Sequence, residues 1–370
     1  MPTTTENTYG AGKSRFAIRH GRGVLFVDSQ GLGDVVQSVP LLKEVCAAAE
    51  GRLPVRVLFA TTDHYDLVRQ ERLEMIPYFV HHLRRDPSGL FRLWMALARK
   101  SDLIVCAPEM SAAKLVVLKI ATGARYAMGE ASASYGKFLT YVVEASWMRP
   151  FNETQDEIAH ALGFDTPLAP PSIRLSPGEL NWAGTELARA GLSDRRTILG
   201  VQCSSVVPSK CWPAERFGAC VRVLGRNVPN LGVISFGTSG ERPAAEVAHG
   251  IGGDVPWLEA TGKWSIRQTL AMLNRCDLFI SGDTGLMHMA AAVGTRTVSI
   301  FGPTSATRRA PRRDGAVAVC PAASCHPCFR GRWTPCECIR DISTERVISV
   351  AMKCIGPVKT SNERMSVVVP

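Results

Sequence analysis

Short, continuous apolar runs alternate with longer helical patterns along most of the chain. Runs of this kind are typical of parallel strands that are covered on both faces. They predict strands at 24–28, 55–60, 103–107, 198–202, 231–236, 278–280, 297–301 and 316–319. The intervening patterns predict helices at 35–50, 63–72, 90–100, 112–122, 153–162, 177–190, 286–293 and 344–354. Strands that alternate with helices favour an α/β fold.

The strand–helix series is interrupted once, at the Pro-rich segment 163–175, which has no hydrophobic period. We therefore expect two α/β domains at 23–165 and 177–355, joined by a linker at 166–176. Residues 1–22 are expected to form a disordered extension, and 356–370 a tail. Two successive α/β halves favour a cleft between them, at the carboxyl ends of both sheets.

Charge and composition narrow the classes of partner. The chain of 370 residues carries 43 Lys and Arg against 33 acidic residues, a net charge of +10. Such a surface suits an anionic partner, whether nucleic acid, an acidic membrane face or a phosphorylated substrate. The sequence has no apolar run long enough to span a membrane and no apolar core of a signal peptide near its start, so a cytoplasmic location is expected.

The turn at 281–285 (SGDTG) lies between a predicted strand and a predicted helix. It places Asp283 and Thr284 at a helix N-terminus, where backbone N–H groups and the helix dipole favour an anion such as phosphate. The alternative is that Asp283 only caps the helix and that His288 is a buried polar residue.

A second glycine-rich turn, Gly31-Leu32-Gly33-Asp34, follows the first predicted strand. It lets another molecule approach the backbone and presents one carboxylate at the carboxyl end of the sheet. Val36 occupies the third small position of a dinucleotide fingerprint, which argues against an NAD-dependent dehydrogenase. Capping of the helix by Asp34 is the alternative.

Two turns in the second half of the chain also contain polar side chains that suit a ligand. The stretch 203–213 holds Ser204, Ser205 and Lys210 beside a helix start, and hydroxyl and ammonium groups suit phosphate oxygens. Glu241 follows the next strand, where a carboxylate can accept hydrogen bonds from ribose hydroxyls. Capping is again the alternative.

Five cysteines cluster late in the chain, between 320 and 338. In a reducing compartment such a cluster indicates a metal before disulfides. The candidate ligands of a structural zinc or iron are Cys325, Cys328, Cys336 and Cys338, with unliganded thiols as the alternative. A basic protein with a cysteine finger could also bind nucleic acid, but aromatic residues make up only 7% and are scattered.

Taken together, these turns resemble glycosyltransferase family 9, whose best-known members are the heptosyltransferases of the lipopolysaccharide inner core. The resemblance is most specific in 282–292 (GDTGLMHMAAA) and 299–304 (SIFGPT). The turn at 29–34 with Pro40-Leu41-Leu42, and the stretch 209–217 (SKCWPAERF), support it. It extends over about 24–350.

The resemblance implies a GT-B fold, which has two Rossmann-like domains, with the acceptor on the first and the nucleotide sugar on the second. It implies an inverting reaction that needs no metal for catalysis. Asp34 would be the general base, within an acceptor site that includes Gly31 and Gly33. Lys210 would bind the diphosphate. The implied donor contacts are Ser204, Ser205, Lys210, Glu241, Asp283, Thr284, Gly285 and His288.

The resemblance also implies the substrates. The donor would be ADP-L-glycero-D-manno-heptose, and the acceptor a hydroxyl of a lipopolysaccharide core or related acidic glycan. The enzyme would then meet the inner membrane peripherally and bind no nucleic acid. A protein acceptor is one alternative, and a nucleic-acid-binding protein with a cysteine metal finger is another.

Overall fold

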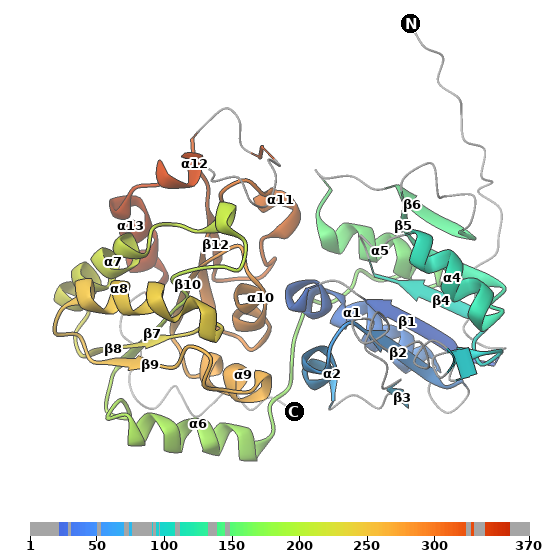
Figure 1. Cartoon of the computed structure of the whole chain (residues 1–370), viewed down its shortest axis with the longest axis horizontal. Coiled ribbons are helices and arrows are strands. Elements are labelled where there is room, and N and C mark those ends of the chain that lie inside the picture. The colour runs from blue at the N-terminus through green and yellow to red at the C-terminus, as the bar shows by residue number, and fades with distance from the viewer. Residues whose placement is uncertain are drawn as a thin grey trace, which may run out of the picture.

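The computed structural model describes residues 22–28, 31–49, 53–69, 74–75, 91, 94–95, 97–107, 112–131, 139–144, 149–322, 327–328 and 337–355. In this part of the chain, two parallel six-stranded sheets form two domains that lie side by side (Figure 1). The predicted α/β class and the arrangement of two Rossmann-like domains are therefore confirmed. The predicted extension and tail lie almost entirely outside the described residues, and the domain boundaries stay predictions.

The first sheet has the order β3-β2-β1-β4-β5-β6. Its strands are β1 (Val24–Asp28), β2 (Val55–Phe59), β3 (Glu74–Met75), β4 (Leu103–Cys106), β5 (Tyr126–Ala131) and β6 (Tyr141–Glu144). Every residue of β1 is buried, as expected for a central parallel strand whose two faces are both covered.

The second sheet has the order β12-β11-β10-β7-β8-β9. Its strands are β7 (Thr197–Val201), β8 (Leu231–Ser235), β9 (Trp257–Glu259), β10 (Leu278–Gly282), β11 (Arg296–Ile300) and β12 (Ala316–Val319). Counted within its own domain, each sheet has the order 3-2-1-4-5-6. The order reverses between β1 and β4 and between β7 and β10, and ligands bind at the carboxyl side of such points.

Helices cover both faces of each sheet. The first sheet packs on α1 (Leu32–Ala49), α2 (Thr62–Val68) and α5 (Phe151–Ala161), with α4 (Ala112–Thr122) on its other face. The second packs on α6 (Pro177–Arg189), α9 (Ile266–Asn274) and α10 (Gly285–Ala292). On its other face lie α7 (Ala214–Asn227), α8 (Arg242–Gly252) and α13 (Thr344–Ile355). Shorter elements are η3 (Pro208–Lys210), η4 (Ser239–Glu241), α11 (Ala306–Arg309) and α12 (Glu337–Arg340).

The two domains meet along α1 and α10. One continuous apolar cluster runs from Val36 and Val39 of α1 to Met289 and Ala290 of α10, so the cores are joined rather than separate. At the helix starts the backbones approach closely, because a Cβ on Gly285 would lie 3.2 Å from the Gly33 nitrogen. A side chain at Gly285 would therefore press the two helix starts apart by a few tenths of an ångström.

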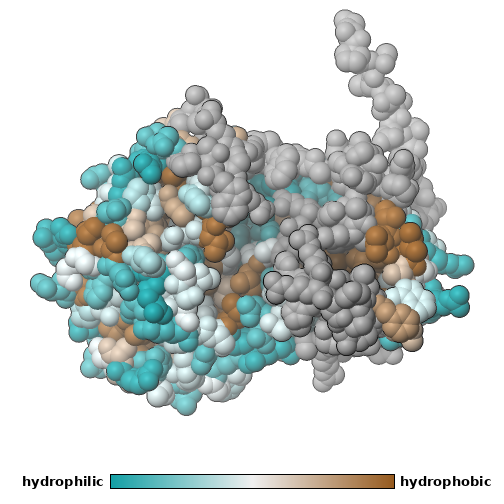
Figure 2. Space-filling model, in the orientation of Figure 1, coloured by the Kyte–Doolittle hydropathy of each residue, from teal (hydrophilic) through white to brown (hydrophobic). Residues whose placement is uncertain are grey.

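The outer face of the first domain carries exposed apolar side chains. On α4, Val117 is 63% exposed and Ile120 is 77% exposed, while Leu115 and Leu118 point into the core. Figure 2 shows brown, apolar surface at this outer end of the molecule, where Figure 1 places α4.

Candidate active site

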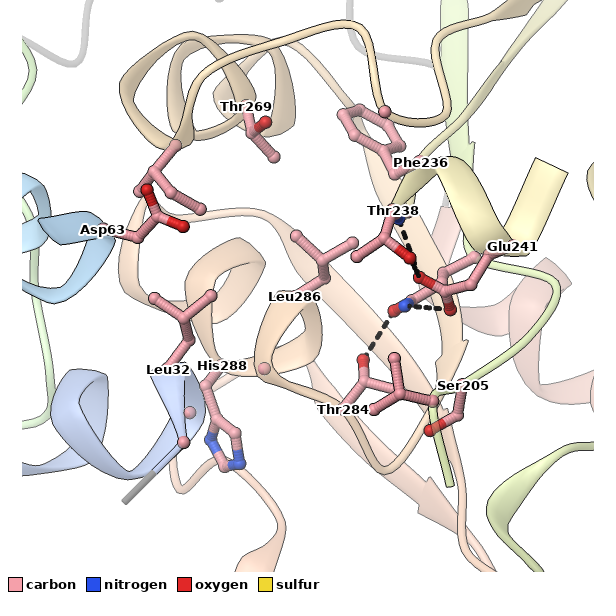
Figure 3. Close-up of a pocket in the computed structure, with 18 of the residues that line it drawn as sticks. Leu32, Asp63, Ser205, Phe236, Thr238, Glu241, Thr269, Thr284, Leu286 and His288 are labelled. Atoms are coloured by element: carbon pink, nitrogen blue, oxygen red, sulfur yellow. Dashed lines mark hydrogen bonds between the residues drawn. The ribbon is translucent and has the colours of Figure 1, made fainter. Parts of the chain in front are cut away.

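A cavity of about 620 Å³ lies between the domains, at the carboxyl ends of both sheets. The start of α1 and Asp63 of α2 line it from the first domain. The second domain contributes the turns after β7, β8 and β10, together with the start of α9 and Arg309 of α11. Figure 3 shows Leu32 and Asp63 on one side of this space, facing Phe236, Thr238 and Glu241 on the other.

The start of α10 points into the cavity. Thr284 is its N-cap residue in an extended conformation, and its side chain makes no capping hydrogen bond. The Thr284 hydroxyl instead donates to Oε1 of Gln202 at 2.6 Å. Gly285 lines the cavity. An N-terminus without a side-chain cap, facing a nucleotide-sized space, can bind a phosphate.

Asp283 is held by two donors and does not cap α10. Its Oδ2 accepts hydrogen bonds from Lys210 Nζ at 2.6 Å and from the Thr304 hydroxyl at 2.7 Å. Burial raises the pKa of this carboxyl, but the Lys210 ammonium and the two hydrogen bonds more than offset it, so the pKa lies below its ordinary value. Asp283 is therefore ionised and holds Lys210 at the cavity wall.

Glu241 belongs to a hydrogen-bonded network beneath the cavity (Figure 3). Its Oε1 accepts from the Gln202 amide at 2.9 Å, and its Oε2 accepts from the backbone N–H of Thr238 at 2.7 Å. Gly237, with φ +145°, lets the chain turn sharply enough for this capping box. Glu241 is thus engaged on both oxygens, and its contact with a ribose stays a prediction.

His288 lies at the junction of the two domains. It is 5% exposed, and a Cβ on Gly33 would lie only 2.7 Å from its Cδ2. Burial lowers the pKa of His288 to about 4. The positive charges of Arg309 and Lys210 also lower this pKa, while the negative charge of Asp283 raises it. The imidazole is therefore neutral near pH 7 and can hydrogen-bond a sugar hydroxyl.

Asp34 lies in the first turn of α1, because the helix begins at Leu32 rather than at the predicted residue 35. Its Oδ2 accepts from the Gly31 backbone N–H at 3.1 Å. Its Oδ1 accepts from Arg309 of the other domain. Asp34, Gly31 and Gly33 all line the cavity. Their roles as base and acceptor contacts stay predictions.

The remaining predicted donor residues differ in placement. Ser205 lines the cavity, whereas Ser204 does not. The Ser204 hydroxyl lies 3.7 Å from the Cys211 sulfur. Phe236, Trp264 and Ile266 form an apolar part of the wall that sequence patterns did not indicate.

The cysteine cluster is only partly described. Cys325 and Cys336 lie outside the described residues, and within them no group of metal-ligating side chains is found. Cys338 is buried and Cys328 packs on the same apolar cluster. The metal prediction therefore stays a prediction.

Three polar residues that hold the predicted site residues in place were not predicted from the sequence. Gln202 joins Thr284 to Glu241, Thr304 holds Asp283, and Arg309 pairs with Asp34. Gln202 and Thr304 each end a predicted strand or its following turn, which is a usable signal. Arg309 is one of several arginines in a polar stretch of the sequence, and nothing in that pattern indicated its place in the site.

Two Rossmann-like domains that line one cavity with the carboxyl ends of their sheets define the GT-B fold. The family model of glycosyltransferase family 9 (heptosyltransferase) matches residues 90–336, and the chain belongs to this family. The resemblance drawn from the sequence is thereby confirmed.

Individual relatives agree with this assignment. The lipooligosaccharide heptosyltransferase 2 of Campylobacter jejuni is 36% identical over 93 residues, which is 24% of this chain and 29% of that protein. The chain thus matches this relative over less than a third of its length.

Solved structures match over nearly the whole chain. A family 9 glycosyl transferase from Veillonella parvula covers 92% of this chain and 99% of its own, with a TM-score of 0.75 and 21% identity. The ADP-heptose lipopolysaccharide heptosyltransferase II of Escherichia coli covers 90% and 98%, with a TM-score of 0.71 and 18% identity. At these identities the likeness establishes the fold.

Proposed function

We propose that the protein is an inverting glycosyltransferase that moves heptose from ADP-heptose to a hydroxyl of a lipopolysaccharide core or related glycan. The observation that carries this proposal is that Asp34 of the first domain and Lys210 and the start of α10 of the second line one cavity. The matched family and the names of its relatives supply the sugar and the nucleotide.

The donor diphosphate would lie at the start of α10, between its backbone N–H groups and Lys210. Lys210 is 24% exposed, so its ammonium can reach a ligand while it remains paired with Asp283. As the sugar leaves the diphosphate, negative charge grows on the departing oxygen. A fixed ammonium and helix dipole stabilise that charge, which is why no cofactor is proposed for catalysis.

The acceptor would enter on the side of Gly31, Gly33 and Asp34. Asp34 takes the proton of the acceptor hydroxyl while that oxygen bonds to the anomeric carbon. The bond from the anomeric carbon to the diphosphate oxygen breaks, and ADP leaves with the electron pair. Because attack comes from the face opposite the leaving group, the anomeric centre is inverted.

The nucleoside would lie against the apolar wall formed by Phe236, Trp264 and Ile266. Phe236 and Trp264 pack edge to face with ring centroids 5.8 Å apart, which leaves a rigid apolar surface for a planar base. Thr238 lies beside them with a hydroxyl at the cavity wall (Figure 3).

We also propose that the enzyme acts as a peripheral protein at the cytoplasmic face of the inner membrane. Helices in the described part of the chain are too short or too polar to cross a bilayer. Val117, Ile120 and Trp94 are exposed on the outer face of the first domain, and Arg99 and Lys100 are exposed close by. Apolar side chains flanked by basic ones suit an anionic lipid surface.

Vesicle flotation tests the membrane proposal. Phosphatidylglycerol vesicles should retain the protein, and neutral phosphatidylcholine vesicles should retain less. Replacing both Val117 and Ile120 by Ser should weaken retention, while Val247→Ser on α8, also an exposed valine, should not. Equal retention of all variants would contradict the assignment of this face.

Calorimetric titration with ADP, UDP, GDP and NADH tests the donor. We expect selective ADP binding that Lys210→Ala weakens about 10- to 100-fold, because a charge-assisted contact is lost and buried Asp283 then repels the diphosphate. Lys353→Ala, an exposed lysine on α13, is the control. A preference for UDP or GDP would discard heptose, and no nucleotide binding would favour the nucleic-acid alternative.

The acceptor class and the cysteines need separate tests. Transfer from ADP-heptose to heptose-deficient lipopolysaccharide would establish the glycan acceptor, and transfer only to polypeptide would establish the protein alternative. For the four cysteines we propose a structural zinc or iron, and anaerobically purified protein without either metal would contradict this.

A further inference from the structure

We propose that Arg309 of the donor domain is a positioning residue for Asp34, so that the base is oriented only when the two domains are docked. This inference rests on the proposed function of Asp34. It concerns a residue outside the motifs that carry the family resemblance.

The contact joins one side chain from each domain. Arg309 Nη1 donates to Asp34 Oδ1, and the Gly31 backbone N–H donates to Asp34 Oδ2. The carboxylate is therefore held from both sides, by its own domain through Gly31 and by the other through Arg309. An ionised carboxylate has about four acceptor positions, so each oxygen keeps one for the acceptor hydroxyl.

Arg309 is itself held in place. Its guanidinium lies 5.9 Å from the centre of the Phe151 ring at the start of α5, also in the first domain. Its side chain is 20% exposed, and that of Asp34 is 16% exposed. A mostly buried pair whose guanidinium lies over an aromatic ring is better ordered than a surface ion pair between two long, mobile side chains.

The neighbouring residue anchors the same helix on the first domain. Arg308 Nη2 lies 3.0 Å from both carboxylate oxygens of Glu130 on β5, and its Nη1 donates to the Arg149 carbonyl at 3.1 Å. Both side chains of this ion pair are almost fully buried, at 3% and 2% exposed. Arg308 therefore fixes α11, and the next residue along the chain reaches the base.

The segment that leads into α11 also contacts the donor side of the cavity. Thr304 donates to Asp283, which holds Lys210, and Ser305 caps α11 by accepting from the Arg308 backbone N–H. Four residues, 305–308, thus separate Thr304, which holds Asp283, from Arg309, which holds the base. The segment can keep base and donor in a fixed relation.

Kinetics with Arg309 variants test the inference. We expect Arg309→Met to lower kcat about 10- to 100-fold, because a base displaced by a fraction of an ångström to an ångström loses its alignment. The KM for the acceptor and the calorimetric affinity for ADP should change less than about twofold. Arg309→Lys should recover part of kcat, since an ammonium keeps one charged donor but not the planar fork.

The matched control is Arg312→Ala. Arg312 is another arginine that reaches the first domain, with Nη1 3.4 Å from Glu153 Oε1, but both side chains are about half exposed. It does not line the large cavity, so this variant should keep wild-type kinetics. An unchanged or raised kcat in Arg309→Met would overturn the inference. A raised acceptor KM at unchanged kcat would instead make Arg309 an acceptor contact.

A second measurement does not depend on turnover. Melting temperatures of Asp34→Ala, Arg309→Met and the double variant form a thermodynamic cycle, because each single variant removes the pair. If the pair is formed, the double variant should shift the melting temperature by less than the sum of the single shifts. Additive shifts would overturn the pair. Wild-type protein that forms this pair but transfers no heptose would overturn the proposed function alone.

Discussion

Two aspartates follow central strands of the two sheets, and their surroundings prepare them for different tasks. Asp283 is 6% exposed and accepts from an ammonium and a hydroxyl on one oxygen, so it acts as a fixed counter-ion for Lys210. Asp34 is more exposed and lines the cavity beside two glycines. Only Asp34 is open to an incoming acceptor.

Replacing Asp34 by Asn should separate binding from chemistry. The amide oxygen can still accept from Arg309 and Gly31, so ADP affinity should be unchanged. The amide is not a base, and turnover should fall about 10²- to 10⁴-fold. Continuous measurement of ADP release, beside calorimetry with ADP, checks both halves. Normal turnover would remove Asp34 from the mechanism.

His288 makes stability depend on pH in a defined direction. Its pKa is about 4 in the folded protein against 6.5 as the ordinary value, so between these pH values the unfolded chain binds more protons. Stability contributed by the neutral imidazole is thus present above pH 6.5 and is lost as the pH falls toward 4, at about 1.4 kcal/mol per pH unit.

Urea denaturation at pH 7 and pH 5 checks this expectation. His288→Gln, which cannot titrate, should lose less stability between the two pH values than the wild type. His249→Gln on α8 is the control, because His249 is exposed and stacked on Trp257. Equal losses in wild type and His288→Gln would contradict the inferred neutral state.

At the scale of elements, two helix N-termini meet at the wall of the cavity. Gly33 in the first turn of α1 contacts Gly285 at the start of α10, and His288 lies one turn further along α10. Both helix dipoles present their positive ends here, so the junction favours anionic ligands at the same place where it joins the domains. A side chain on either glycine would push the two helix starts apart, which would disturb both the anion site and the contact between the domains.

Gly33→Ala should therefore weaken both stability and activity. The new Cβ would lie 2.7 Å from His288 Cδ2 and 3.3 Å from Gly285 Cα. Such overpacking costs about 1–3 kcal/mol, and the shift of α1 should also lower turnover. Gly178→Ala in α6, where no atom lies within 4 Å of the new Cβ, should leave both unchanged. Thermal denaturation and initial rates measure the effects.

Elements with a strong local pattern were predicted well from the sequence. The buried runs give β1, β2, β4, β7, β8, β10, β11 and β12 to within two residues of their ends. The missed strands β3, β5, β6 and β9 are short or carry charged residues such as Glu130 and Glu144, so they lack a continuous apolar run. Their strand conformation depends on the neighbours that they pair with.

The residues of the candidate site also fall into those that local sequence indicates and those that it does not. Asp34, Lys210, Asp283 and Thr284 were predicted because each follows a strand or begins a helix, where local sequence already implies the position. Arg309 could not be predicted, since it is 275 residues from Asp34 and one of several nearby arginines. Which arginine reaches the base depends on how the two domains dock.

At the scale of the molecule, the docking of the domains combines apolar and charged contacts. The apolar cluster along α1 and α10 supplies non-directional attraction, while Arg308 and Glu130 supply a directional contact between α11 and β5. Breaking a buried ion pair by removing one partner costs far more than removing an exposed one, because the remaining charge stays buried. The Arg308–Glu130 pair should therefore fix one domain orientation.

Glu130→Ala is expected to loosen this orientation without unfolding either sheet. The variant leaves the Arg308 guanidinium, whose side chain is 3% exposed, without that carboxylate, at a cost of about 3–5 kcal/mol. Because the charge can reach water if the domains part, we expect a larger radius of gyration in small-angle X-ray scattering and lower turnover at unchanged far-UV circular dichroism. Arg312→Ala, which removes an exposed interdomain pair, should match the wild type in all three measurements. A wild-type scattering curve for Glu130→Ala would mean that the other contacts between the domains fix their orientation without this ion pair.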